Sequence, residues 1–368
     1  MVLVALNLRP AIASVPPLAD TISADFGLSA AATGVLTTLP VLCMGLFAPI
    51  GALGARRFGS ERVLAAALVL TCAGTAMRAV PAFWMLYVAT ALTGVGIAVA
   101  GALLPPLVRA RFPTRVGPVT GLYTTGLIGG ALLAASLTEP VRAALDLHWS
   151  VVLALWALPA AFALGCWLLV GRGTSAVPAG AGGSPPWRSA RVWYATFFMG
   201  GQSLLYYASL AWLAARYTAI GYSAAQAGLL LGLFSATQLV SALGMPLLAH
   251  RLGDARPWIA AALALTGGSL ALVAFAPTGA PWLWASVLGL GMGGQFALAL
   301  TVLSTLGANP AESAAASGMA LFLGYLLAAA GPVLTGALLD ATGSYVLPFA
   351  ALAVFSVPVL LAGVRAAR

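Results

Sequence analysis

The sequence contains no lysine, and only 7% of its 368 residues are charged. Soluble proteins carry about a quarter charged residues, so this low share argues against a water-soluble chain. Hydrophobic residues make up 61% of the positions, and a soluble fold of that composition would expose large apolar patches. We therefore predict an integral membrane protein, with the lipid bilayer as its partner over most of the surface.

Cysteine and histidine are also scarce. Cys43, Cys72 and Cys166 fall in separate apolar runs, which gives neither a disulfide framework nor metal-ligand spacing. His148 and His250 lie in predicted loops and are too few to form a metal site alone. We expect no metal and no other cofactor. The net charge of +9 does not indicate nucleic acid as a partner, because the 17 arginines are spread along the chain rather than clustered with aromatic residues.

Long apolar runs divide the chain into segments of about 20 residues, the length that a helix needs to cross a bilayer. The first run leads directly into a full-length span, so we expect no cleaved signal peptide. The twelve predicted spans are 1–22, 30–54, 62–80, 82–108, 117–139, 148–170, 192–216, 223–249, 257–276, 281–307, 312–339 and 345–364.

The arginines are divided unevenly between the two sides of the predicted membrane. The positive-inside rule assigns the arginine-rich side to the cytoplasm, so both termini are expected there, at the plasma (inner) membrane. An even number of spans also requires both termini on one side. The arginine-rich side holds Arg56, Arg57, Arg62, Arg109, Arg111, Arg115, Arg172, Arg188, Arg191, Arg251, Arg256, Arg365 and Arg368, and the other side holds Arg78, Arg142 and Arg216.

The chain contains an internal repeat. GLSAAATGVL begins at Gly27, and the similar GYSAAQAGLL begins at Gly221. At the same offset, Arg62 falls on Arg256. The repeat predicts an all-α fold of two pseudo-symmetric six-helix bundles, 1–171 and 191–368, joined by a Gly/Pro/Ser-rich cytoplasmic linker at 172–190. Parallel repeats of this kind are typical of carriers that work by alternating access, and we expect a monomer.

Arg9 is the one arginine that lies well inside a predicted span, because the others fall in connections or near span ends. It precedes Asp20 by about 11 residues, roughly 16 Å of helix, which puts it near the bilayer centre. A guanidinium facing lipid there costs at least ~2.5–3.5 kcal/mol. One interpretation is a packing arginine bonded to backbone carbonyls and Asn7. We favour a side chain that faces an aqueous central cavity, and since no acidic residue falls at this depth, that cavity is predicted to bind an anion.

Amide, hydroxyl and aromatic side chains in other spans are further candidates for the cavity wall. Gln202 and Tyr206 lie one helical turn apart and share a face. Tyrosine and tryptophan in an apolar span also occur as core residues or in the interfacial belt, so that interpretation stays open for them. The predicted substrate-binding residues are Arg9, Asn7, Tyr123, Thr124, Gln202, Tyr206, Tyr207, Trp212, Gln295 and Tyr325.

The loop GALGARRFGSER, residues 51–62, resembles the signature of the major facilitator superfamily between its second and third spans. Ala55 stands where that signature has aspartate. In the family such a loop holds helix ends together and releases them as the bundles move, and plain positive-inside charge is the alternative. The resemblance implies a conformational latch at Gly51, Arg56, Gly59 and Arg62, with Arg251 at the repeated position in the second half.

Several longer runs resemble the cyanate and 2-nitroimidazole transporter branch of this superfamily, among them NLRPAIASVPPL, GIAVAGALLPPLVRARFP and FFMGGQSLLYYASLAWL. The resemblance implies a secondary transporter that moves a small solute by a rocker-switch mechanism. A small anion such as cyanate, held by Arg9, is the expected substrate, and export of flat neutral compounds such as 2-nitroimidazoles is the alternative. Gly101 and Leu321 replace an asparagine and a glutamine expected in this branch, which makes the cavity less polar.

Other functional classes have less support. The sequence shows no nucleophile–base pair, metal cluster or nucleotide-binding loop, so we predict that the protein is not an enzyme. A receptor is disfavoured because there is no large extramembrane segment, and a channel because of the duplicated halves. The lack of an acid in the predicted path favours facilitated transport, exchange, or coupling through protons bound to the substrate itself, and coupling through Glu139 at the membrane boundary stays open.

Overall fold

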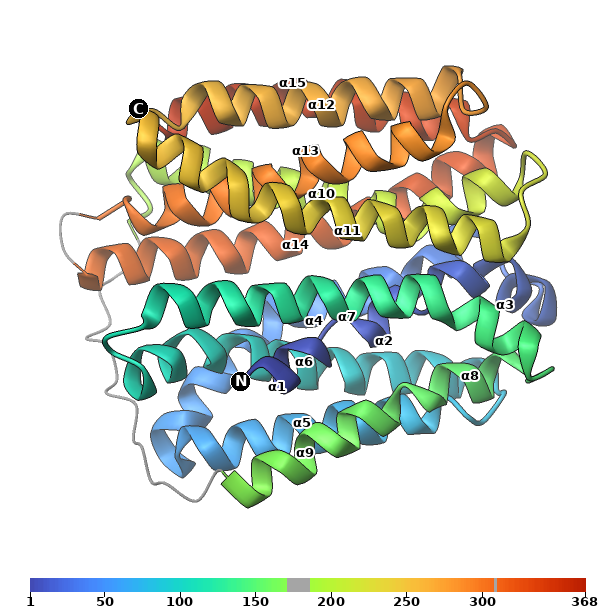
Figure 1. Ribbon diagram of the computed structural model, residues 1–368, viewed down its shortest axis with the longest axis horizontal. Helices are drawn as coiled ribbons and strands as arrows, with labels where there is room; N and C mark the ends of the chain where they lie inside the picture. Colours follow the sequence, from blue (N-terminus) through green and yellow to red (C-terminus); the bar gives the residue numbers. More distant parts are fainter. Residues whose placement is uncertain (171–185, 308–309) are drawn as a thin grey trace.

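The computed structural model describes residues 1–170, 186–307 and 310–368, and within them every regular element is a helix. Figure 1 shows the helices in two bundles, with α4 and α7 of the first bundle facing α14 and α11 of the second. The prediction of two six-span bundles is confirmed. The linker predicted at 172–190 lies mostly outside the described residues.

The helices of the first bundle form six spans, the first made of four short helices and the sixth of two. They are α1 (Val2–Leu6), α2 (Pro10–Ala13), η1 (Pro16–Leu18), α3 (Ala19–Phe26), α4 (Ala30–Phe58), α5 (Ser60–Met77), α6 (Phe83–Arg111), α7 (Val116–Ala144), α8 (Trp149–Leu155) and α9 (Ala157–Val170). The second bundle consists of α10 (Ala190–Thr218), α11 (Ala224–Leu252), α12 (Arg256–Phe275), α13 (Pro281–Ser304), α14 (Pro310–Thr342) and α15 (Val346–Ala366).

Each predicted span corresponds to a helix or a broken helix, and the largest difference in bounds is at the end of α7, Ala144 against 139. Eleven of these spans in the described residues are long and apolar enough to cross a membrane. The exception is α10. Its side chains are buried almost continuously from Ala195 to Tyr217, so they contact other helices rather than lipid, and polar residues such as Gln202 are tolerated there.

The first span is broken near its middle. Proline lacks a backbone N–H, and its ring clashes with the carbonyl of the residue four positions earlier. The chain accordingly leaves α1 at Asn7 and re-enters a helix at Pro10, and η1 begins at Pro16. Arg9 is the residue that precedes α2, so its side chain leaves the backbone at the break.

The two bundles approach most closely at the face away from the chain termini. A Cβ added at Gly34 on α4 would lie 2.6 Å from Pro332 O on α14, and one at Gly228 on α11 would lie 2.9 Å from Ala135 O on α7. Toward the face that carries the termini, a Cβ added at Gly121 on α7 or at Gly244 on α11 would meet no atom within 4 Å. The α7–α11 pair therefore opens toward the terminal face, as the slope of α11 indicates in Figure 1.

Candidate functional site

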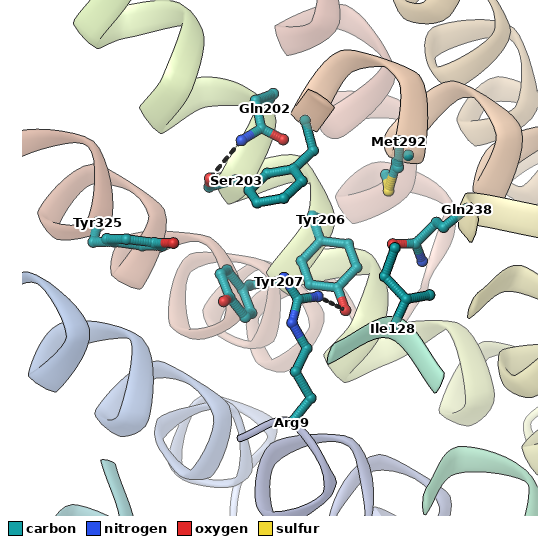
Figure 2. A pocket seen from close by; sticks show the side chains of 11 residues that line it. Arg9, Ile128, Gln202, Ser203, Tyr206, Tyr207, Gln238, Met292 and Tyr325 are labelled. Carbon is teal, nitrogen blue, oxygen red and sulfur yellow. Dashed lines mark hydrogen bonds between the residues drawn. The ribbon is translucent and has the colours of Figure 1, made fainter. Parts of the chain in front are cut away.

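The Arg9 side chain crosses from the first bundle to the second. Its Nη1 donates a hydrogen bond of 2.6 Å to the hydroxyl of Tyr206 on α10 (Figure 2). The guanidinium carbon lies 4.8 Å from the centre of the Tyr206 ring and 5.9 Å from that of Phe296 on α13. Such contacts stabilise a desolvated cation, by up to about 2 kcal/mol each. The charge is thus held at the boundary between the bundles by neutral aromatic groups.

No carboxylate in the described part of the chain, which includes all eight acidic residues, forms an ion pair with Arg9. The acids have other partners: Glu61 pairs with Arg111 and Glu139 with Arg142. A guanidinium has five N–H donors, and among the described contacts Arg9 uses one hydrogen bond. A permanent positive charge with free donors therefore lies in the interior without a fixed counter-ion.

A small cavity adjoins the guanidinium. The space open to the centre of a water molecule is about 20 Å³, enough for one or two waters or a small ion. Two of its lining residues come from the first bundle and nine from the second. The lining consists of Arg9, Ile128, Gln202, Ser203, Tyr206, Tyr207, Gln238, Met292, Gly293, Phe296 and Tyr325.

Four of the lining residues come from one face of α10, at positions i, i+1, i+4 and i+5. Gln202 Nε2 donates to Ser203 Oγ at 2.7 Å and to the carbonyl of Met199 at 3.1 Å. The hydroxyl of Tyr207 lies 3.6 Å from the sulfur of Met44 on α4, a second contact between the bundles. The polar wall of the cavity is therefore built on α10, and Arg9 faces it from the first bundle.

The structure brings half of the predicted substrate-binding residues together, namely Arg9, Gln202, Tyr206, Tyr207 and Tyr325. The other five are outside the cavity lining. Asn7 donates a hydrogen bond to Leu3 O at 2.7 Å, and Trp212 donates one to Pro332 O at 2.8 Å. Gln295 is fully buried, and Tyr123 and Thr124 are partly buried on α7. The packing interpretation required a hydrogen bond between Asn7 and Arg9. Asn7 bonds Leu3 instead.

Sequence reasoning did not assign Gln238, Ile128, Met292, Gly293 or Phe296 to the site. Gln238 carried a usable signal, since it is an amide within the apolar run of α11, and it lines the cavity with its amide nitrogen 3.4 Å from Phe234 O. The apolar residues carried no such signal, because isoleucine and methionine occur equally at positions that face a cavity and at positions that face lipid.

The residues of the predicted latch lie at the terminal face. Gly51 packs closely, since a Cβ there would lie 3.1 Å from Val99 O, and Gly59 turns the chain between α4 and α5 with a φ of 86°. Arg56 lies in the last turn of α4. Arg62 and Arg251 are exposed.

The acidic residue of this loop is Glu61, and its partner belongs to the same bundle. Its carboxylate forms an ion pair with Arg111, and the guanidinium of Arg111 lies 5.1 Å from the ring centre of Trp167. The indole N–H of Trp167 in turn donates to Glu61 O at 3.1 Å. This cluster joins α5, α6 and α9 within the first bundle.

Comparison with known proteins agrees with this architecture. The family model of the Major Facilitator Superfamily matches residues 3–332. The chain belongs to the major facilitator superfamily. Members are transporters, and the chain resembles two from Escherichia coli (strain K12). It is 37% identical to the 2-nitroimidazole transporter, over 100% of this chain and 94% of that protein. It is 32% identical to the cyanate transport protein CynX, over 95% of this chain and 91% of that one.

Solved structures share the fold at low sequence identity. The nucleoside transporter NupG superposes with a TM-score of 0.78 at 14% identity, covering 100% of this chain and 98% of that one. A D-xylose–proton symporter gives a TM-score of 0.74 at 16% identity, covering 98% and 94%. The family predicted from the sequence is confirmed, and the protein is a multi-pass membrane transporter.

Proposed function

We propose that the protein carries a small monovalent anion, such as cyanate, across the membrane by alternating access, with Arg9 as the anion anchor. The observation that carries this proposal is the position of the Arg9 guanidinium. It borders a central cavity, it bonds a neutral tyrosine, and no carboxylate among the described residues pairs with it.

The placement of Arg9 also links binding to movement. An anion on the planar guanidinium fork accepts parallel N–H bonds, the geometry for which arginine is better suited than lysine. Arg9 belongs to the first bundle, whereas the polar residues around it, including Gln202 and Tyr206, belong to the second. A bound anion would therefore add to the Arg9–Tyr206 contact between the bundles and further stabilise the closed state.

Export of a flat compound such as a 2-nitroimidazole is the second candidate. It is supported by the similarity to the 2-nitroimidazole transporter and by the rings of Tyr206, Tyr207 and Phe296, on which a flat ligand can stack. A ring with a nitro group needs more room than a cavity that holds one or two waters, so the walls must separate to admit it. A triatomic anion requires a smaller displacement of the walls.

Ligand binding to purified protein tests both candidates. We expect cyanate binding to weaken at least tenfold in Arg9→Gln and less in Arg9→Lys, which keeps the charge but not the fork. The control is Arg188→Gln, an exposed arginine outside the spans, which should bind as the original does. Equal cyanate binding by the Arg9→Gln variant would rule out the anchor. Binding of 2-nitroimidazole alone, unaffected by Arg9→Gln, would favour the second candidate.

We further propose that the terminal face is cytoplasmic and that transport is uniport or exchange by a monomer. The arginine count supports the orientation, and the lack of a carboxylate among the described cavity residues supports the absence of proton coupling. Proteoliposomes test the coupling. Accumulation of labelled cyanate against its gradient, driven by an imposed pH difference, would contradict uniport.

A further inference from the structure

We propose that the central cavity selects weakly hydrated, linear, monovalent anions, the class of thiocyanate, azide and cyanate. It should discriminate against strongly hydrated anions of similar or smaller size, such as formate and fluoride, and against dianions such as sulfate. This inference rests on the proposed role of Arg9 and adds a rule for substrate choice.

Charge is the first part of this selectivity. The cavity contains one guanidinium, and the described acids are elsewhere, so one negative charge neutralises the site. A dianion would leave a net negative charge among buried side chains. An uncompensated charge in a low-dielectric interior is strongly unfavourable.

The supply of hydrogen-bond donors is the second part. The amide of Gln202 is already bonded to Ser203 and to the Met199 carbonyl, and the Tyr207 hydroxyl contacts Met44. The donors left for a ligand are the guanidinium and three hydroxyl hydrogens. The Tyr206 oxygen accepts from Arg9 and the Ser203 oxygen from Gln202, so both O–H groups can still donate, as can that of Tyr325. So few donors cannot replace the water shell of a strongly hydrated ion, whereas a weakly hydrated ion has less to lose.

The third part is the character of the opposite wall. Ile128, Met292 and Phe296 line the cavity with apolar, polarisable surface. The amide of Gln238 lies beside Ile128 and Met292, and its nitrogen donates to Phe234 O at 3.4 Å (Figure 2). Figure 2 places Ile128 and Met292 on the side of Tyr206 away from Ser203. A methionine thioether and aromatic edges favour soft, polarisable groups. A linear anion can place one end on Arg9 and its soft end against this wall, which formate and fluoride cannot do.

The test is binding of sodium salts to the purified full chain at constant ionic strength, measured by titration calorimetry and thermal shift. Weakly hydrated anions also destabilise proteins non-specifically, so each salt is compared between the original chain and Arg9→Gln. We expect thiocyanate and azide to bind at least tenfold more tightly than formate and fluoride, with the difference lost in Arg9→Gln. Cyanate is a usable probe because the chain has no lysine, which leaves the N-terminal amine and the three cysteine thiols as the groups it can modify.

A change in the apolar wall gives a second measure. Met292→Gln has similar length and adds a donor, so the preference for thiocyanate over formate should fall several-fold, whereas Met292→Leu should retain it. Arg9-dependent binding of formate, fluoride or sulfate that equals or exceeds that of thiocyanate would overturn the selectivity and leave the anion anchor intact. Absence of Arg9-dependent binding for every anion would overturn the proposed function as well. If a Met292 variant does not fold, the order of anion affinities in the original chain still tests the selectivity.

Discussion

Asp340 in the second bundle caps the helix that begins at Ala30 in the first. Its Oδ1 accepts the backbone N–H of Ala30 at 2.7 Å, and its Oδ2 accepts that of Ala31 at 2.8 Å. The first N–H groups of a helix have no partner within the helix, and a carboxylate there also interacts favourably with the helix dipole. In the reverse direction, Asp20 of the first bundle accepts from Thr218 of the second at 2.6 Å. Two carboxylates thus hold the bundles together at the face away from the termini.

Replacing Asp340 with alanine should loosen this closure. We expect a loss of about 1–2 kcal/mol, the usual worth of a helix cap, and so a roughly 5- to 30-fold larger population with the α4 end released. Hydrogen exchange followed by mass spectrometry on the peptide that contains Ala30 and Ala31 measures it directly. Asp254→Ala is the control, since that carboxylate is exposed and pairs with Arg256 within the second bundle. Unchanged exchange in Asp340→Ala would show that the cap does not restrain the bundles.

Two adjacent glycines on α7 provide a matched pair. A Cβ at Gly130 would lie 2.0 Å from Leu6 O, a backbone atom that can move only if α1 moves, whereas one at Gly129 would meet nothing within 4 Å. We expect Gly130→Ala to lower the free energy of unfolding by roughly 1–3 kcal/mol and to weaken anion binding, because Arg9 follows Leu6 closely. Gly129→Ala should be neutral or stabilising by up to ~1 kcal/mol. Thermal unfolding and titration calorimetry of both variants provide the comparison. Equal behaviour of the pair would contradict the packing argument.

The bounds of the spans were predictable because every residue that faces the hydrocarbon core of the bilayer must be apolar. The break in the first span was also indicated, since Pro10 follows Arg9 directly. The extent of α7 was not, because its last turns carry Glu139 and Arg142, whose charges mark a loop in the sequence but pair with each other on the helix at 2.7 Å.

The residues of the site were predictable only where it was known which face of the helix points toward the cavity. Gln202, Ser203, Tyr206 and Tyr207 share a face of α10, but Trp212 lies six residues beyond Tyr206, about 240° around the helix, and bonds α14 instead. Gln295 is next to the lining residue Phe296, and one step of about 100° turns it away. A single sequence does not fix this rotation, since in a membrane protein both buried and lipid-facing sides are apolar.

Arg78 is expected to support the position of Arg9. It is fully buried at the end of α5, and its guanidinium donates to Ala11 O at 2.7 Å and to Thr90 Oγ1 at 3.1 Å. Ala11 is two residues from Arg9. Arg78→Gln should lower the free energy of unfolding by about 1.5–3 kcal/mol, the worth of a hydrogen bond to a charged group, and should also weaken anion binding. The exposed Arg188→Gln serves again as the control in thermal unfolding. A variant as stable as the control would show that this buried contact is not structural.

Anion binding should be independent of pH between about 5 and 9. The guanidinium of Arg9 stays protonated throughout, a free phenol ionises only near pH 10, and thiocyanate remains an anion.

Outside the spans, the hydrogen bonds from Arg256 hold the pKa of Asp254 below its usual value. A lowered pKa contributes stability that is present above the unfolded-state pKa and lost as pH falls through the folded one, below this window.

Titration calorimetry with thiocyanate at each pH measures this independence, and Arg9→Lys provides the contrast. A desolvated lysine ammonium loses its proton more readily, so binding by that variant should weaken as pH rises. If the original chain instead lost affinity tenfold per pH unit, a titrating group would have to share the site. The proposal of an arginine anchor without a proton-coupled acid would then be wrong.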